Sequence, residues 1–245
     1  KKFRYSSGAG QTEGLFCLVR TTRKLPKWLL RLAVHGAPQA FGGGGHVDIG
    51  DAQGREGSVN YGINPVSKKC CSFAGPAITV SVLQRDNLAA HAVMKFVKPG
   101  DILVVETRDC LGGAVFGAHM AGQYKNGGVA AIVTDGLIRD LDELEEIGIP
   151  VFARGANPNG PHKNGPGSIG MDVTIGGVKI SAGDIVVGDC DGVIVVPQEN
   201  IQETLAELDD VLKNEAALNA EVKGGSRISS YAEECLAGDD VRYVD

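Results

Sequence analysis

The stretch that decides the fold is Gly117-Ala-His-Met-Ala-Gly-Gln-Tyr-Lys-Asn-Gly-Gly-Val-Ala-Ala-Ile-Val-Thr-Asp-Gly-Leu-Ile-Arg139-Asp140. It has the pattern of a glycine-containing loop, a short helix, a buried strand and an Arg-Asp pair that opens the next helix. In open α/β sheets, ligands bind beyond the carboxyl ends of the strands. The pattern therefore predicts that loop N–H groups, a guanidinium and a carboxylate converge, as a site for a small oxo-acid on a divalent metal requires.

Strands and helices alternate before this stretch and within it. Residues 73–83 predict a strand, 88–97 a helix ended by Pro99-Gly100, and 101–106 a buried strand. After residue 150, strands follow strands, up to a helix that opens with the capping-box pattern Asn200-Ile-Gln-Glu203. One stripe of this helix is apolar, formed by Ile201, Leu205, Leu208 and Leu212.

This order of elements predicts a mixed α/β architecture with a single core domain. We place the core at residues 46–200. Residues 1–45 form an N-terminal segment of uncertain structure, and residues 201–245 form a C-terminal helix and tail.

Composition excludes several classes of partner. The 245 residues carry a net charge of −6 without a basic cluster, so nucleic acid is not expected to bind. No apolar run reaches the ~20 residues of a membrane span. The six cysteines form neither a CxxC motif nor a zinc spacing, which predicts reduced, mostly buried thiols in a cytoplasmic protein.

Each candidate site residue has a structural alternative. Arg139 and Asp140 are candidates to bind an oxo-acid and a metal, or else a surface arginine and a helix cap. The N–H groups of Gly117, Ala118, His119 and Met120 could cradle a carboxylate at a helix start, or the loop could be an ordinary connection. His119 is a candidate proton carrier, or a structural histidine.

Two further segments remain open to two interpretations. The long Gly/Pro/Asn loop 155–170 contains His162 and Lys163, and it is either a lid or a solvent-exposed connection. Asp189-Cys-Asp191-Gly192 is either a turn or a cation site. The sequence has no GxSxG motif, no GxGxxG motif after a predicted strand and no Walker A motif, which argues against a serine triad and against nucleotide cofactors.

Several blocks, in family order over residues 50–215, resemble the regulator of ribonuclease activity A superfamily. Within it they are most similar to the class II 4-hydroxy-4-methyl-2-oxoglutarate/4-carboxy-4-hydroxy-2-oxoadipate aldolases. The blocks include Phe73-Ala-Gly-Pro-Ala-Ile-Thr-Val80, Asp86-Asn87 with His91, Val133-Thr-Asp-Gly-Leu-Ile-Arg-Asp140 and Gly183-Asp-Ile-Val-Val-Gly-Asp-Cys-Asp-Gly-Val-Ile-Val-Val-Pro197.

The resemblance implies a swivelling β/β/α fold, which is an α/β/β/α sandwich, in homotrimers or pairs of trimers with the site between subunits. It implies that Asp140 and several waters hold Mg²⁺ or Mn²⁺, that Arg139 binds the oxo-acid, and that the N–H groups of residues 117–120 grip its carboxylate. The implied function is a lyase that cleaves a pyruvate-containing oxo-acid, by retro-aldol cleavage or oxaloacetate decarboxylation, through a metal-bound pyruvate enolate.

The chain departs from the aldolase pattern at one position. The aldolases have an acid 21 positions before the arginine, where this chain has Ala118. Two other functions therefore stay open, a non-catalytic, protein-binding regulatory trimer and a metal-dependent enzyme of another reaction type.

Overall fold

Strand β4 (Phe73–Val82) organises the fold, and all ten of its residues are buried. The computed structural model describes residues 2–3, 17–19, 46–67, 69, 71–238 and 241–242. Most of the segment 1–45 therefore lies outside the described residues. On one side, β4 pairs in parallel with β5 (Ile102–Glu106), which continues the sheet through β7 (Ala131–Thr134) and β9 (Val151–Ala153).

The other side of β4 is divided between two neighbours. Its first half pairs antiparallel with β14 (Ile185–Asp189), and its second half pairs antiparallel with β11 (Gly167–Ile169). Because β4 belongs to both layers, the sheet bends from one layer into the next. The shorter strands that complete the sheets are β1 (Lys2–Phe3), β2 (Cys17–Val19), β3 (Asn64–Pro65), β12 (Val173–Ile175), β13 (Val178–Ile180) and β15 (Gly192–Val196).

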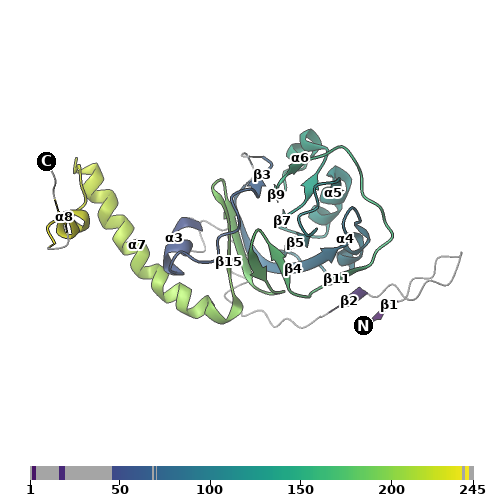
Figure 1. The fold of residues 1–245 in the computed structure, drawn as a ribbon, viewed down its shortest axis with the longest axis horizontal. Coiled ribbons are helices and arrows are strands. Elements are labelled where there is room, and N and C mark those ends of the chain that lie inside the picture. The colour runs from purple at the N-terminus through teal and green to yellow at the C-terminus, as the bar shows by residue number, and fades with distance from the viewer. Residues whose placement is uncertain are drawn as a thin grey trace, which may run out of the picture.

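Helices cover both outer faces of the strands (Figure 1). One group is α4 (Leu88–Ala92) with the 3₁₀ turn η1 (Val93–Lys95), α5 (Ala118–Asn126) and α6 (Leu141–Ile147). The other is α3 (His46–Ala52) with α7 (Ile201–Lys223), which follows the 3₁₀ turn η2 (Gln198–Asn200) and leads to α8 (Ser230–Leu236). Among the described residues, no helix combines the length and the apolar character needed to cross a membrane.

Three apolar clusters separate these layers. One contains Leu103 and Tyr124 and fills the space between the parallel sheet and α4 to α6. A second, with Phe152 and Val186, lies between the two strand layers. The third, with Leu208, lies beneath α3 and α7. Three clusters between four layers confirm the predicted α/β/β/α sandwich.

The structure corrects one detail of the predicted C-terminal helix. The apolar stripe is confirmed, since Ile201, Leu205, Leu208 and Leu212 all pack in the third cluster. The capping box is wrong, because the Asn200 side chain makes no capping hydrogen bond. Asn200 already has helical φ and ψ at the end of η2, whereas an N-cap side chain needs a non-helical backbone to reach the first N–H groups.

The cysteine prediction is wrong for one pair. Cys71 and Cys190 form a disulfide, with their Cα atoms 5.4 Å apart. The physical reason is the register of β4 and β14, in which Phe73 lies opposite Gly188, so that the residues just outside the paired strands face each other. The other cysteines that the structure describes in full, Cys110 and Cys235, are free thiols.

Candidate functional site

A small three-stranded sheet positions the candidate site. Its order is β10 (Gly155–Ala156), β8 (Leu137–Ile138) and β6 (Ala114–Phe116), and β8 is parallel to both neighbours. Parallel strands end at the same edge, so the residues that follow β6 and β8 become neighbours. The structure thereby brings Gly117 and Ala118 next to Arg139 and Asp140, although about twenty residues separate the two pairs in sequence.

Asp140 directs its carboxylate toward the start of α5. Its backbone is left-handed (φ 63°, ψ 50°), a conformation that aspartate tolerates better than most residues. Its carbonyl accepts a hydrogen bond from the Leu144 N–H at 3.0 Å, but its side chain does not cap α6. Instead, Oδ2 accepts a hydrogen bond from the Ala118 N–H at 3.2 Å and lies 3.6 Å from the Arg139 Nε.

Two glycines give the Arg-Asp pair its space. A Cβ atom on Gly117 would lie 2.2 Å from the Asp140 Oδ2 and 2.9 Å from the Arg139 Cγ. A Cβ atom on Gly160 would lie 2.9 Å from the Arg139 Nη1. The arginine side chain thus passes Gly117 and ends against Gly160. The sequence marks the loop around Gly160 as a candidate lid, but it gives no sign of this contact.

The first turn of α5 can bind an anion. By helix geometry, the N–H groups of His119 and Met120 have no acceptor within the helix, and the helix dipole favours negative charge there. The side chains of Ala118 and Met120 are buried, so these residues contribute to the site only through the backbone. The His119 side chain is exposed, and the Arg139 and Asp140 side chains are 44% and 32% exposed. The site is therefore open to small molecules.

The donor set fits a hard divalent cation with one protein ligand. Among the described residues, no three or more His, Cys, Asp or Glu side chains gather in a way that could enclose a metal. Mg²⁺ keeps most of its waters and is commonly bound through one or two carboxylates. Asp140 suits this mode, because its Oδ1 has no hydrogen-bond partner among the described residues and its side chain is accessible.

The buried carboxylate of Asp135 stiffens the segment before β6. It accepts hydrogen bonds from the Thr107 N–H at 2.6 Å and the Asp109 N–H at 2.8 Å. Burial raises the pKa of the Asp135 carboxyl, while these donors act in the opposite direction. These hydrogen bonds bracket Arg108 and Asp109, which have left-handed backbones with φ of 58° and 53°. The sequence does not reveal this support.

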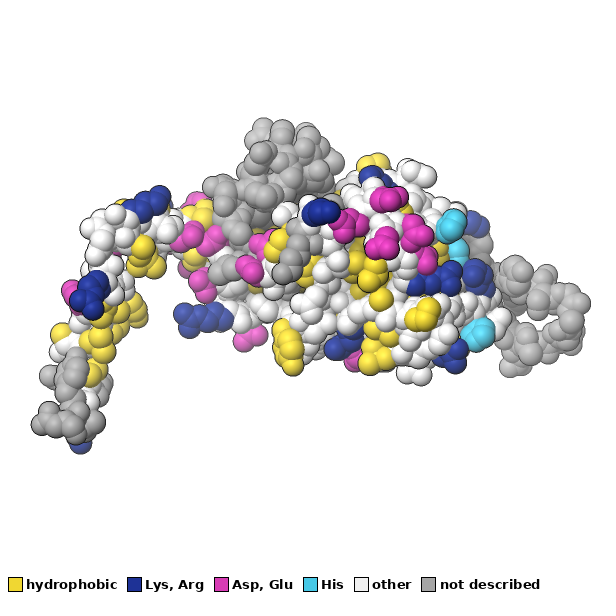
Figure 2. Space-filling view, turned by 90° about the horizontal axis from the view of Figure 1, so that it is seen from above, with side chains coloured by type: hydrophobic (Ala, Val, Ile, Leu, Met, Phe, Trp, Pro, Cys, Tyr) yellow, Lys and Arg dark blue, Asp and Glu magenta, His cyan; other side chains and the backbone are white. Residues whose placement is uncertain are grey.

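Backbone hydrogen bonds hold the long loop beside the site. The Asn159 carbonyl accepts from the Ala114 N–H at 2.8 Å, and the His162 N–H donates to the Arg85 carbonyl at 2.7 Å. His162 and Lys163 are exposed. Figure 2 shows a group of acidic side chains close to Lys, Arg and His side chains on the face that carries α5 and α6. The predicted turn at Asp189 is confirmed, since its carboxylate accepts from the Asp191 N–H at 2.8 Å.

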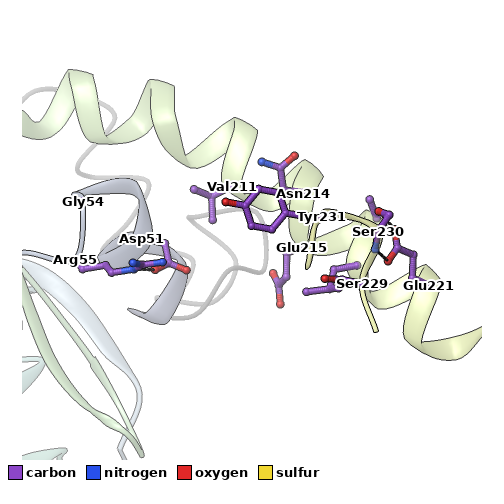
Figure 3. Close-up of a pocket in the computed structure, with 12 residues that line it drawn as sticks. Asp51, Gly54, Arg55, Val211, Asn214, Glu215, Glu221, Ser229, Ser230 and Tyr231 are labelled. Carbon is purple, nitrogen blue, oxygen red and sulfur yellow. Dashed lines mark hydrogen bonds and ion pairs between the residues drawn. The ribbon is translucent and has the colours of Figure 1, made fainter. Parts of the chain in front are cut away.

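A separate hollow of about 770 Å³ lies between the end of α3 and the helices α7 and α8. Figure 3 shows Asp51 and Arg55 side by side at one end and Glu221 with Ser230 at the other. Asp51 lies 3.6 Å from Arg55, and the Glu221 carboxylate accepts from the Ser230 hydroxyl at 2.6 Å. These charges already have partners, and the hollow contains none of the candidate residues. We therefore place the candidate site at Arg139 and Asp140.

Comparison with known proteins places the chain in a family. The family model described as RraA-like, Aldolase/RraA, matches residues 46–195. The chain belongs to the RraA-like family. The match includes all of β6, α5, β8 and the Arg139-Asp140 pair, so the family sequence covers the site. The resemblance found in the sequence is confirmed.

Individual members of the RraA-like family differ in the functions their names give. A protein of Halalkalibacterium halodurans, named "Putative 4-hydroxy-4-methyl-2-oxoglutarate aldolase", is 39% identical over 130 residues, which are 52% of this chain and 62% of that protein. The chain thus matches less than two thirds of that relative's length.

Two solved structures carry the name of a regulator. RraAS2 of Streptomyces coelicolor, described as an unusual member of the RNase ES inhibitor RraA protein family, is 27% identical with a TM-score of 0.68, over 81% of this chain and 99% of that one. The RNA-processing inhibitor RraA from Thermus thermophilis is 26% identical with a TM-score of 0.57, over 62% of this chain and 91% of that one.

Proposed function

We propose that this RraA-like protein is a divalent-metal-dependent lyase that cleaves a C–C bond of a pyruvate-containing oxo-acid, by retro-aldol cleavage or oxaloacetate decarboxylation. One observation carries the proposal. The Asp140 carboxylate turns away from its own helix toward the start of α5 and the Arg139 side chain, and Gly117 leaves the space for it. The relative named as an aldolase supports the same chemistry.

Each residue has a distinct role in this proposal. Asp140 is the direct protein ligand of Mg²⁺ or Mn²⁺. When bound, such a cation polarises the 2-oxo group and stabilises the negative charge that develops on it. Arg139 binds the oxo-acid through its planar guanidinium, which matches a carboxylate in a bidentate manner. The N–H groups at the start of α5 hold the pyruvyl carboxylate.

His119 is the proton carrier in this proposal. It is exposed at the second position of α5. The preceding residue, Ala118, stands where the aldolases have their acid. An imidazole nitrogen can both accept and donate a proton, so His119 can return a proton to the product carbon. We further propose that the protein assembles as a homotrimer or hexamer, in which a neighbouring subunit covers the open side of the site.

A non-catalytic, protein-binding trimer is the second candidate function. Ala118 favours it, because the first turn of α5 lacks the carboxylate that the aldolases carry there. One solved relative is described as an RNA-processing inhibitor, and the other as an unusual member of an RNase ES inhibitor family.

Release of pyruvate from oxaloacetate tests the proposal. With Mg²⁺ or Mn²⁺ the protein is expected to release pyruvate faster than the metal ion alone, and oxalate is expected to inhibit it. Arg139→Lys is expected to weaken oxalate inhibition by ~10-fold, since lysine keeps the charge but loses the bidentate geometry. Equal rates with and without the protein would favour the regulatory function.

The Gly117→Ala variant is expected to lower the rate of pyruvate release by ~10²-fold, because displacing a reacting group by about 1 Å costs that much. The new methyl group would overlap the Asp140 Oδ2 and press on the Arg139 Cγ. The backbone at Gly117 is extended (φ −142°), so alanine adds no backbone strain.

Gly122→Ala provides the matched control in the same helix. A Cβ atom there would meet only the Ile147 Cδ1, at 3.9 Å. This variant should keep its activity and gain up to ~1 kcal/mol of stability from helix propensity. If Gly117→Ala and Gly122→Ala have the same rate, the space beside Asp140 does not matter for the reaction.

A further inference from the structure

Asn87 occupies an unusual place behind the candidate site. The residue is 2% exposed, and it stands at the N-cap position of α4 without capping the helix. Asp86 caps the helix instead, because its Oδ1 accepts a hydrogen bond from the Leu88 N–H at 2.9 Å. The Asn87 amide is therefore left to make contacts outside its own helix.

Both amide hydrogens of Asn87 can be used across the turn between β6 and α5. Nδ2 lies 2.9 Å from the Val115 carbonyl oxygen and 3.1 Å from the Met120 Sδ. Val115 lies in β6 and Met120 in the first turn of α5, so one planar amide links the two ends of the segment that contains Gly117 to His119. An amide has two donors, and this arrangement occupies both of them.

The backbone of Asn87 also fixes the loop that flanks Arg139. Its N–H donates to the His162 carbonyl at 3.0 Å. Two residues before His162, Gly160 meets the end of the Arg139 side chain. Asn87 thus makes hydrogen bonds to both sides of the site: to the turn between β6 and α5, and to the loop that contains Gly160 and His162.

We infer that Asn87 is a positioning residue that holds the first turn of α5, and with it the Ala118 N–H that contacts Asp140, in the orientation needed to bind the oxo-acid. This role rests on the proposed function. It goes beyond that function because Asn87 touches neither the metal ligand nor the substrate-binding arginine. Without the amide donors, β6 and the first turn of α5 lose their hydrogen bonds to Asn87, and the contact of Phe116 with Tyr124 holds only a later part of the helix.

The test compares Asn87→Asp with a matched control, Thr79→Val. Aspartate keeps the shape of asparagine but replaces the donor with an acceptor that faces the Val115 carbonyl. Thr79 is also fully buried, and its hydroxyl donates to the Met171 carbonyl at 2.6 Å, outside the candidate site. Asn87→Asp loses the two N–H donors of the amide and Thr79→Val loses one O–H donor, so both variants lose buried hydrogen bonds and stability. Asn87→Ser, whose hydroxyl cannot reach both partners, is the second variant if Asn87→Asp does not fold.

Two measurements follow each variant. In the presence of Mg²⁺, Asn87→Asp is expected to weaken oxalate binding in calorimetry by at least ~10-fold, since small displacements of binding groups have large effects. Hydrogen exchange in the free protein is expected to quicken by ~10-fold at the Ala121 N–H, which bonds the Gly117 carbonyl at 3.1 Å. Thr79→Val is expected to change neither quantity by more than about twofold.

The outcomes separate this inference from the proposed function. If the wild type binds no oxalate, the proposed function fails, and hydrogen exchange alone still decides whether Asn87 holds the turn. Wild-type exchange at Ala121 and wild-type oxalate affinity in the Asn87 variants would overturn the inference. Equal losses in Thr79→Val would overturn it as well, because the effect would then reflect general stability.

Discussion

The Asp140→Asn variant is expected to lose Mg²⁺-dependent release of pyruvate by ~10³-fold or more, because a catalytic metal supplies several kcal/mol and each ~1.4 kcal/mol is a factor of ten. Asparagine is chosen because it tolerates the left-handed backbone at this position, as aspartate does. The variant therefore removes the negative charge without a new backbone strain. Calorimetric titration with Mn²⁺ and the rate with oxaloacetate measure the two effects.

Asp142→Asn is the control for this experiment. Asp142 lies two residues later, exposed in the first turn of α6, and makes no contact with Arg139 or Ala118 among the described contacts. It should keep the metal affinity and the rate of the wild type. Wild-type affinity for Mn²⁺ in Asp140→Asn would show that the metal binds elsewhere.

The sequence predicts the fold well because the layers follow from periodic patterns. The run of buried residues in β4 and the stripe on α7 both depend on neighbours within a few residues, and both are found as predicted. The meeting of Gly117 with Asp140 also follows from a simple rule, since β6 and β8 are parallel and end at one edge. The resemblance to the RraA-like family adds the order of the layers.

Features that depend on distant contacts could not be predicted in this way. Gly160 leaves room for the end of the Arg139 side chain only because the loop 155–170 passes beside it. The link from Asn87 to Val115 spans 28 residues and involves a carbonyl group, which has no sequence signature. The left-handed backbone of Asp140 turns its carboxylate from α6 to α5. Aspartate can adopt several backbone conformations, so the sequence does not predict which one occurs here.

Removal of the Cys71–Cys190 disulfide is expected to lower the free energy of unfolding by about 2–5 kcal/mol. The bond joins residues 119 positions apart. In the chain-entropy model, a cross-link that closes a loop of ~100 residues lowers the entropy of the unfolded chain and raises its free energy by ~4.7 kcal/mol. The bond also joins the loop before β4 to the β14–β15 turn, next to the point where the two strand layers share β4.

Urea unfolding of the wild type, with and without a reductant, measures this effect. The reductant should move the midpoint of the wild type to that of Cys71→Ser/Cys190→Ser and should leave the double variant unchanged. Cys235→Ser is the control, because this free and exposed thiol is expected to contribute within about 0.5 kcal/mol. A midpoint of the wild type that does not respond to the reductant, together with six titratable thiols in the denatured protein, would show that Cys71 and Cys190 are not bonded. The register of β4 and β14 would then have to be held by its backbone hydrogen bonds and apolar contacts alone.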